Sequence, residues 1–232
     1  MKVCAVIVAG GSSERFGGEV PKQFIEVHGR PLLSWTISRF EASSVVDQIV
    51  VVVAEEYLLF VSERVVDPFG FAKVSKIVIG GVTRPESVLK GLEALPLATD
   101  FAAIHDGARP LVRPEDIDRV VQTAVRERAA ILAVPATDTV KRVAGDYVLS
   151  TQDRNALYLA QTPQVFQYDL IINAHRRAAA GSDTEWITDD ASIIERAGFK
   201  VKVVEPSAPN LKVTSRDDLA IVDALLRREH SG

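Results

Sequence analysis

The chain has 232 residues, of which 47% are hydrophobic and 25% are charged, and its formal net charge is −4. This length and apolar content suffice for one sizeable core, so we expect a single domain over residues 1–232. The negative charge disfavours a protein that binds nucleic acid or a membrane surface, because sequence-independent binding to phosphate groups needs a basic surface. Cys4 is the only cysteine, which excludes an internal disulfide and a cysteine-based metal cage. The apolar segment 3–9 is too short for a signal peptide or a membrane span, so we expect a cytoplasmic protein.

Apolar runs rich in β-branched residues alternate along the chain with segments that have helical periodicity. The runs lack polar alternation, which is typical of strands buried on both faces of a sheet. We therefore predict an α/β fold with three layers, in which helices flank both faces of a mostly parallel, Rossmann-like sheet. The predicted strands are residues 3–8, 49–54, 74–79, 101–104 and 131–135, and the predicted helices are residues 31–42, 55–66, 85–95, 114–126, 168–180, 189–197 and 215–228.

Residues 137–155 break this alternation. Two short polar strands, 139–143 and 147–151, surround the pair Gly145-Asp146, which is typical of a hairpin turn. A two-stranded hairpin is not stable alone in water, so it must pack on something else. It either folds against its own domain or projects as an arm towards another chain.

The segment VAGGSSERFGGEVPKQF follows the first predicted strand and combines small residues with two cations. Gly10 and Gly11 allow main-chain N–H groups to approach an anion closely, and Arg15 and Lys22 supply positive charge. The spacing fits neither a Walker A motif nor the dinucleotide fingerprint. We interpret the segment as a nucleotide loop of another kind, with an ordinary surface turn as the alternative.

Four loops follow predicted strands and should meet at one edge of the sheet, because ligands of parallel sheets bind outside the carboxyl ends of the strands. They are residues 9–22, 80–87, 105–109 and 135–138. In the second loop, Gly80, Gly81 and Ser87 offer backbone groups to a base edge or form a tight turn. In the third, Asp106 lies near a ribose, a metal ion or both, or it caps a turn. The neighbouring His105 is more typical of a structural residue, since no other histidine has ligand spacing with it.

Further motifs narrow the interpretation. They are GGVTRPESV, HDGARP, DTVKR, DRNALY, QTPQVF, TDDAS and LKVT, spread from Gly80 to Thr214. In this order, together with the glycine-containing loop, they resemble the 2-C-methyl-D-erythritol 4-phosphate cytidylyltransferases of the non-mevalonate isoprenoid pathway. The resemblance spans essentially the whole chain. The chain departs from the family pattern at Ser13, Val82 and Gly107, where a glycine, an acidic residue and an alanine are common.

The resemblance implies transfer of CMP from CTP to 2-C-methyl-D-erythritol 4-phosphate, which gives 4-diphosphocytidyl-2-C-methyl-D-erythritol and pyrophosphate. It implies Mg²⁺ carried mainly by the CTP phosphates, with Asp106 as a candidate ligand, and a homodimer in which residues 137–155 form the dimerisation arm. It assigns catalysis to Arg15, Lys22 and Lys212, nucleotide binding to Ala9, Gly10, Gly11, Ser12, Gly80, Gly81, Ser87, Asp106 and Gly107, and acceptor-phosphate binding to Arg109, Thr139, Arg154, Thr162 and Thr188.

The chemistry of the acceptor phosphate fits a site that is rich in cations and poor in histidine. A phosphate monoester has a second pKa of about 6, so at pH 7 it is largely a dianion and needs no general base. Two alternatives stay open. A ribitol 5-phosphate cytidylyltransferase would share the loop and most motifs, and a nucleotide-binding protein without turnover would share the fold, although the presence of both Arg15 and Lys22 disfavours it.

Overall fold

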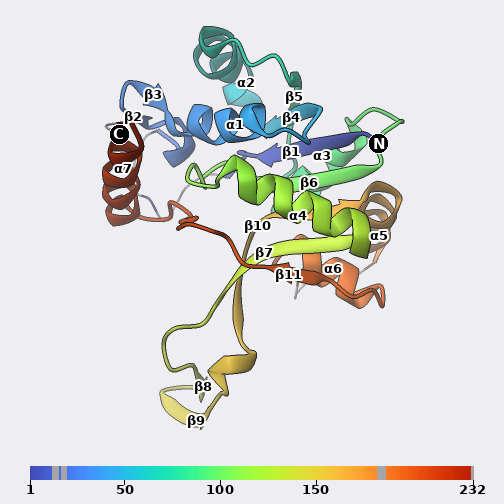
Figure 1. Cartoon of the computed structure of the whole chain (residues 1–232), viewed down its shortest axis with the longest axis vertical. Coiled ribbons are helices and arrows are strands. Elements are labelled where there is room, and N and C mark those ends of the chain that lie inside the picture. The colour runs from blue at the N-terminus through green and yellow to red at the C-terminus, as the bar shows by residue number, and fades with distance from the viewer. Residues whose placement is uncertain (12–15, 17–19, 182–186, 231–232) are drawn as a thin grey trace.

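A seven-stranded sheet forms the centre of the computed structural model, which describes residues 1–11, 16, 20–181 and 187–230 (Figure 1). In spatial order the strands are β11 (Lys202–Val204), β7 (Ala129–Pro135), β10 (Tyr158–Gln167), β6 (Phe101–Asp106), β1 (Val3–Val8), β4 (Gln48–Val53) and β5 (Val74–Ile79). Strand β10 runs antiparallel to β6 and β7, and the other pairs are parallel. The predicted mostly parallel sheet is confirmed.

Two strands of this sheet were not predicted. The middle of β10 carries Gln161, Thr162 and Gln164, so it lacks the continuous apolar run that marked the other strands. Strand β11 has only three residues. Both strands pair with β7. Local sequence patterns do not predict such pairing between distant segments.

The helices are α1 (Leu32–Ala42), α2 (Leu58–Phe60), α3 (Arg84–Glu93), α4 (Pro114–Glu127), α5 (Tyr168–Ala180), α6 (Asp190–Arg196) and α7 (Arg216–His230). Residues 55–66 are helical as predicted, but they change from a 3₁₀ turn (Glu55–Tyr57) through α2 to a π-helix (Val61–Val66). None of the helices among the described residues combines the length and the apolar composition that a membrane span needs.

Two hydrophobic cores lie on opposite faces of the sheet. Along β1, Val3, Ala5 and Ile7 point into one core, while Cys4 and Val6 point into the other. Helices α1 and α4 cover the first core, and α3, α5 and α6 cover the second. Strands of this kind need apolar residues on both faces, which explains why their sequences are continuous apolar runs. The predicted three-layer arrangement is confirmed.

Gly91 sets how closely α3 approaches the sheet. A Cβ at this position would lie 2.4 Å from Val6 Cγ1 and 2.8 Å from Val52 Cγ2, so only glycine allows this packing. The helix begins at Arg84, where Thr83 Oγ1 accepts a hydrogen bond from the backbone N–H of Glu86. Close packing at Gly91 thereby holds the first turn of α3 at the edge of the sheet where β5 and β6 end.

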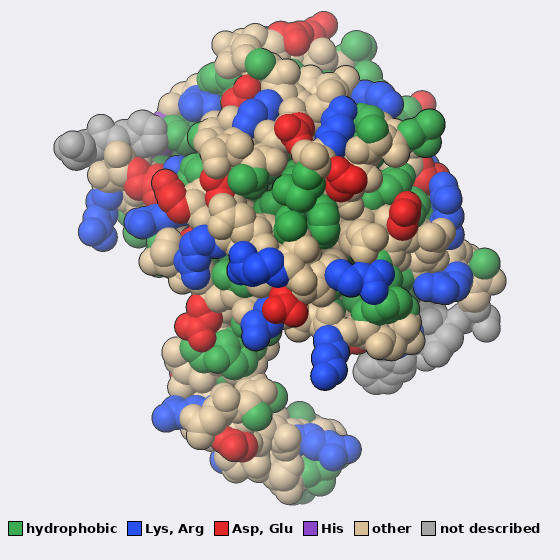
Figure 2. All heavy atoms as spheres, turned by 45° about the vertical axis from the view of Figure 1, so that its right-hand side comes forward, with side chains coloured by type: hydrophobic (Ala, Val, Ile, Leu, Met, Phe, Trp, Pro, Cys, Tyr) green, Lys and Arg blue, Asp and Glu red, His purple; other side chains and the backbone are tan. Residues whose placement is uncertain are grey.

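The predicted hairpin is present as β8 (Lys141–Ala144) and β9 (Tyr147–Thr151), joined by a turn in which Gly145 has φ +54°. It projects from the body, with a hollow between the two bordered by several Lys and Arg side chains (Figures 1 and 2). The two strands form a sheet of their own. The arm therefore does not fold back against its own domain, and it presents exposed apolar side chains, Val143, Tyr147, Val148 and Leu149.

Candidate active site

A cavity of about 410 Å³ lies at the carboxyl ends of β1 and β6, beside the first turn of α3. It brings together many residues that were predicted from separate motifs. Its lining comprises Val8, Ala9, Gly10, Gly11, Lys22, Gln23, Gly81, Val82, Thr83, Arg84, Ser87, Asp106, Ala108 and Lys212. Gly80 and Gly107 adjoin lining residues in the chain without lining the cavity themselves. The predicted residues Ser12 and Arg15 lie outside the described residues, as does Ser13.

The loop after β1 is held by a buried glutamine. Gln23, which is 3% exposed, donates hydrogen bonds from Nε2 to the backbone oxygens of Ala9 (2.8 Å) and Gly11 (3.1 Å). The backbone N–H of Ala9 is bonded to Val52 O at 2.7 Å. Lys22 precedes Gln23 in a short 3₁₀ turn whose last residue, Phe24, is buried. Gln23 was not singled out from the sequence, although it follows Pro21 and Lys22 in the segment interpreted as a nucleotide loop.

Side chains of α3 hold the backbone of the loop at residues 80–83. Ser87 Oγ accepts a hydrogen bond from Gly81 N (3.0 Å) and lies 3.3 Å from Gly81 O, while Lys90 Nζ donates to Gly80 O at 2.8 Å. Glu86 Oε2 accepts from Val82 N at 2.9 Å. A Cβ on Gly81 would lie 2.3 Å from Glu86 Cβ, so the loop can lie against α3 only because this residue is glycine.

Asp106 is the electrostatic centre of the cavity. Its carboxylate contacts Lys212 at 2.8 Å, Arg84 at 3.3 Å and Arg109 at 3.5 Å, and only 11% of its side chain is exposed. Burial alone would raise the pKa of Asp106, but the charges of Arg84, Lys212 and Arg109 outweigh it and hold this pKa well below its usual range. Asp106 is therefore ionised at every physiological pH, and it orients three cations at the cavity.

Arg84 joins this centre to a second buried carboxylate. Its Nη2 contacts Asp190 at 2.9 Å, and Asp190 Oδ1 in turn lies 3.1 Å from His175 Nε2. The opposite charges of Asp190 and Asp106 raise the pKa of Arg84 despite its burial, so the guanidinium stays charged. Sequence reasoning missed Arg84 as a site residue, because its spacing in GGVTRPESV does not reveal which carboxylates it meets.

The residues predicted for the acceptor phosphate lie in different places. Arg109 contacts Asp106, whereas Thr162 is 4% exposed beneath the cavity. Thr139 and Arg154 are exposed on the arm, where Arg154 Nη1 donates to Thr137 O at 3.0 Å. Thr188 is exposed just before α6. Within the single chain, Arg109 contacts the carboxylate of Asp106 and Thr162 Oγ1 lies 3.1 Å from its backbone nitrogen, whereas Thr139, Arg154 and Thr188 are not among the residues that line the cavity.

The side chains that line the cavity can be compared with the ligands that the predicted Mg²⁺ needs. Among the described residues, no three His, Cys, Asp or Glu side chains gather in a way that could hold a metal ion. Of the residues that the structure describes, Asp106 is the one carboxylate that lines the cavity. This arrangement fits a Mg²⁺ held mainly by triphosphate oxygens, with at most one protein carboxylate among its ligands.

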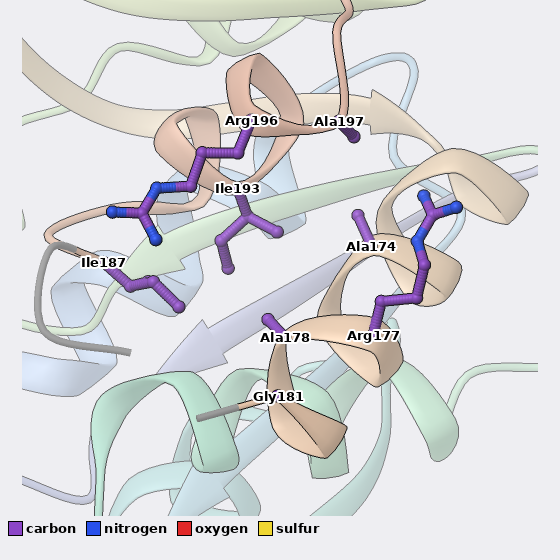
Figure 3. A pocket seen from close by; sticks show the side chains of 8 residues that line it. All are labelled: Ala174, Arg177, Ala178, Gly181, Ile187, Ile193, Arg196 and Ala197. Atoms are coloured by element: carbon purple, nitrogen blue, oxygen red, sulfur yellow. The ribbon is translucent and has the colours of Figure 1, made fainter. Parts of the chain in front are cut away.

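A second cavity, of about 310 Å³, lies between α5 and α6 (Figure 3). Ala178, Ile187 and Ile193 point towards one another in its floor, and Arg177 and Arg196 stand on the two helices at its sides. As far as the chain is described, its lining includes none of the residues predicted for the site and no carboxylate. One glycine, Gly181, lines this cavity, whereas Gly10, Gly11 and Gly81 line the first one.

The chain is similar to known proteins over nearly its whole length. The family model described as 2-C-methyl-D-erythritol 4-phosphate cytidylyltransferase matches residues 3–228. The chain belongs to this family. It is 44% identical over 227 residues to a protein of that name from Pelotomaculum thermopropionicum, covering 97% of this chain and 94% of the relative. A relative from Geotalea uraniireducens is 40% identical over 233 residues, covering 100% of this chain and 99% of that protein.

Solved structures show the same fold. The crystal structure of 4-diphosphocytidyl-2C-methyl-D-erythritol synthase from Anaerococcus prevotii has a TM-score of 0.85 at 29% identity, covering 97% of this chain and 98% of that one. The 2-C-methyl-D-erythritol 4-phosphate cytidylyltransferase from Thermus thermophilus has a TM-score of 0.77 at 32% identity, with coverages of 98% and 100%. The family expected from the motifs is thus confirmed.

Proposed function

We propose that this protein transfers CMP from CTP to 2-C-methyl-D-erythritol 4-phosphate, producing 4-diphosphocytidyl-2-C-methyl-D-erythritol and pyrophosphate. The observation that carries the proposal is the ionised Asp106 with Lys212, Arg84 and Arg109 around it, next to the glycine backbone of two loops. Family membership and the names of the relatives support this substrate pair.

In the proposed reaction, a phosphate oxygen of the acceptor attacks the α-phosphorus of CTP. A bond forms between that oxygen and phosphorus, the bond to the β-phosphate oxygen breaks, and pyrophosphate leaves. The acceptor phosphate is largely a dianion at pH 7 and needs no base. Among the described residues, His105 is the histidine nearest to Asp106 in sequence, and burial lowers the pKa of His105 to about 3, so it stays neutral.

The protein supplies alignment and positive charge. Lys22 lines the cavity and precedes Gln23, which bonds to the carbonyls of the loop, and Lys212 lines the same cavity and contacts Asp106. We propose that Arg15, Lys22 and Lys212 neutralise the charge that develops on the phosphates in the transition state. When bound, Mg²⁺ would neutralise further negative charge on the triphosphate, with Asp106 as its protein ligand.

The base is recognised by backbone in this proposal. Gly80, Gly81 and Ser87 would hold the cytosine edge, while Ala9, Gly10, Gly11, Ser12, Asp106 and Gly107 would hold the ribose and phosphates. The bonds from Lys90 and Glu86 fix the orientation of the loop backbone before the base arrives. A fixed set of donors and acceptors favours one base, because a mismatched edge leaves buried polar groups unpaired.

We further propose a homodimer in which the arm completes the site of the partner. Thr139 and Arg154 lie on the arm away from the cavity of their own chain, and the arm exposes Tyr147 and Leu149, with 80% and 58% exposed. In such a dimer they would join Arg109 and Thr188 around the acceptor phosphate. Arg suits this role because its planar guanidinium can bind two phosphate oxygens. We propose the cytoplasm, which supplies CTP, as the place of the reaction.

Pyrophosphate release tests the activity. The purified protein is given CTP and Mg²⁺ with 2-C-methyl-D-erythritol 4-phosphate, with ribitol 5-phosphate, or with no acceptor. We expect release with the methylerythritol substrate and little in the other two arms. Preferential release with ribitol 5-phosphate would contradict the proposed acceptor, and CTP binding without release in any arm would identify a non-catalytic nucleotide-binding protein.

A further inference from the structure

Three polar side chains are buried directly beneath the cavity without lining it. His105, Thr162 and Asn210 are 0%, 4% and 3% exposed, and none contributes to the cavity wall. They come from the end of β6, the middle of β10 and the segment that leads to Lys212. Buried polar groups are costly unless they are hydrogen-bonded, so their partners indicate what they do.

The backbone of Thr162 needs a hydrogen-bond partner outside the sheet, because the pairing of β10 with β7 is interrupted at this residue. The register between β10 and β7 shifts between Ala160 and Gln164, so the residues between them are outside the regular ladder. Their backbone groups must therefore find other partners. Asn210 Nδ2 donates to the backbone oxygen of Thr162 at 2.8 Å, which ties β10 to the segment carrying Lys212.

The direction of each hydrogen bond around His105 follows from its partners. His105 Nε2 lies 3.1 Å from the backbone oxygen of Arg109, which can only accept, so Nε2 carries the hydrogen. In the neutral ring Nδ1 then accepts, and the hydroxyl of Thr162, 3.0 Å away, donates to it. Thr162 Oγ1 in turn accepts from the backbone N–H of Asp106 at 3.1 Å. The hydroxyl hydrogen of Thr162 therefore points to His105 Nδ1 and is not donated to another acceptor.

The same network extends through Arg109 to the segment that carries Lys212. Arg109 Nη1 donates to Asn210 O at 2.8 Å, and the backbone N–H of Val213 donates to Ala108 O at 2.9 Å. Lys212, between Asn210 and Val213, then reaches Asp106. The position of Asp106 relative to Arg109 and Lys212 depends on this buried network.

We propose that His105 and Thr162 act together as positioning residues that hold Asp106 and Arg109 in the geometry required for cytidylyl transfer. This inference rests on the proposed function. It differs from the sequence-based prediction that Thr162 binds the acceptor phosphate, because here Thr162 acts through Asp106 and His105. The two roles change different kinetic constants: positioning affects kcat, whereas a lost ground-state contact raises the KM for the acceptor.

The experiment uses the variants T162V, T162S, H105Q and the double variant T162V/H105Q. Valine has nearly the shape of threonine but no hydroxyl, and glutamine keeps a donor in place of Nε2–H while removing the Nδ1 acceptor. T99V is the matched control, because Thr99 is also buried (7% exposed) and its hydroxyl donates to Pro96 O at 2.7 Å, remote from the cavity. For each variant, kcat, both KM values and the melting temperature are measured.

We expect T162V and H105Q each to lower kcat by roughly ten- to a hundredfold, since small misplacements of reacting groups have effects of this size. The double variant should be little worse than either single one, because both remove the same link. T162S should recover most of the loss, and T99V should lower the melting temperature with kcat unchanged. A raised acceptor KM alone in T162V, independent additive effects, or loss of stability without loss of kcat would each overturn the proposal.

A spectroscopic measurement is independent of turnover. The nitrogen chemical shifts of His105 in the wild-type protein should show a neutral ring with hydrogen on Nε2. In T162V, the Nδ1 signal should shift because its hydrogen-bond donor is lost. Hydrogen on Nδ1 in the wild type would overturn the proposed network. If the wild type released no pyrophosphate, the proposed function would fail while this measurement still decided the geometry.

Discussion

At the scale of single residues, the site is a balance of buried charges. Asp106 and Asp190 carry two negative charges, and Arg84, Arg109 and Lys212 carry three positive ones, which leaves one net positive charge before Lys22 is counted. Ionised partners lower the cost of holding cations in a partly buried cavity. The excess positive charge attracts a polyphosphate, and the pairing keeps the cations ordered before it binds.

Lys22 gives the first residue-scale prediction. We expect Lys22→Ala to lower kcat at saturating CTP by about 10²- to 10³-fold, which is the loss typical of removing one transition-state donor. The exposed Lys200, on a loop outside the cavity, provides the control, and Lys200→Ala should behave as wild type. An unchanged kcat combined with a raised KM for CTP would show that Lys22 serves ground-state binding only.

At the scale of elements, the first turns of α3 act as a frame for the loop before them. Ser87 bonds to Gly81 and Lys90 to Gly80, so one face of the helix fixes consecutive peptide groups. Gly91, one turn further along, sets the distance of that helix from the sheet. Base selectivity should therefore depend on this helix.

The selectivity is measurable as the ratio of kcat/KM for CTP and UTP. We expect the wild type to prefer CTP by about 10²-fold or more, because the wrong base edge leaves buried polar groups unpaired. Ser87→Ala should reduce this ratio by about tenfold. Ser38→Ala removes a helix hydroxyl from α1 that bonds to Trp35 O, and it should leave the ratio unchanged. Equal use of CTP and UTP by the wild type would refute backbone recognition of cytosine.

A second element-scale prediction concerns the start of α7. Asp218 Oδ2 accepts from Thr214 Oγ1 (2.6 Å) and Ser215 N (2.8 Å), and Ser215 Oγ accepts from Asp218 N (3.2 Å), which is a reciprocal capping arrangement. The hydrogen bond from the Thr214 hydroxyl, followed by those from the backbone, lowers the pKa of Asp218 to about 2.

Because the pKa of Asp218 is lower in the folded chain than the value of about 4 in an unfolded one, its contribution to stability is complete above that value. The contribution is lost as the pH falls from about 4 towards 2. We expect the melting temperature of wild type to exceed that of Asp218→Asn at pH 6, and the gap to narrow between pH 5 and pH 2. A gap independent of pH over this range would contradict the assignment of the cap to the ionised carboxylate.

At the scale of the whole molecule, the arm connects oligomeric state with chemistry. If Arg154 completes the partner's site, Lys22 and Arg154 of one working site come from different chains. Mixing Arg154→Ala subunits with Lys22→Ala subunits should then restore activity, because each hybrid contains one intact site. Random exchange gives about half hybrids with one good site of two, so about a quarter of wild-type activity is expected.

The control for this mixture is a verified exchange of subunits. Each parental variant alone should stay nearly inactive, and deletion of the hairpin tip around Gly145 should abolish the recovery. A mixture that exchanges subunits yet stays as inactive as its parents would show that each arm serves its own chain.

Much of the fold follows from local sequence. Continuous apolar runs such as 3–8 and 49–54 identify strands buried on both faces, and Gly145-Asp146 identifies the hairpin turn. Strand β10 could not be recognised in this way, because the polar residues in its middle are accommodated by contacts with His105 and Asn210. Its place depends on residues that lie far away in the sequence.

Local sequence identified the chemical groups of the site: glycine loops, cations, the carboxylate of the HDGARP motif, and the family that carries these motifs in this order. Which of these groups come into contact depends on tertiary packing. Asp106 pairs with Arg84 and Lys212, and Arg84 pairs with Asp190, across separations of 22 and 106 residues. Local patterns report the preferences of neighbouring residues, whereas these pairs form because the sheet brings the ends of separate strands to one edge and burial then requires each charge to find a partner.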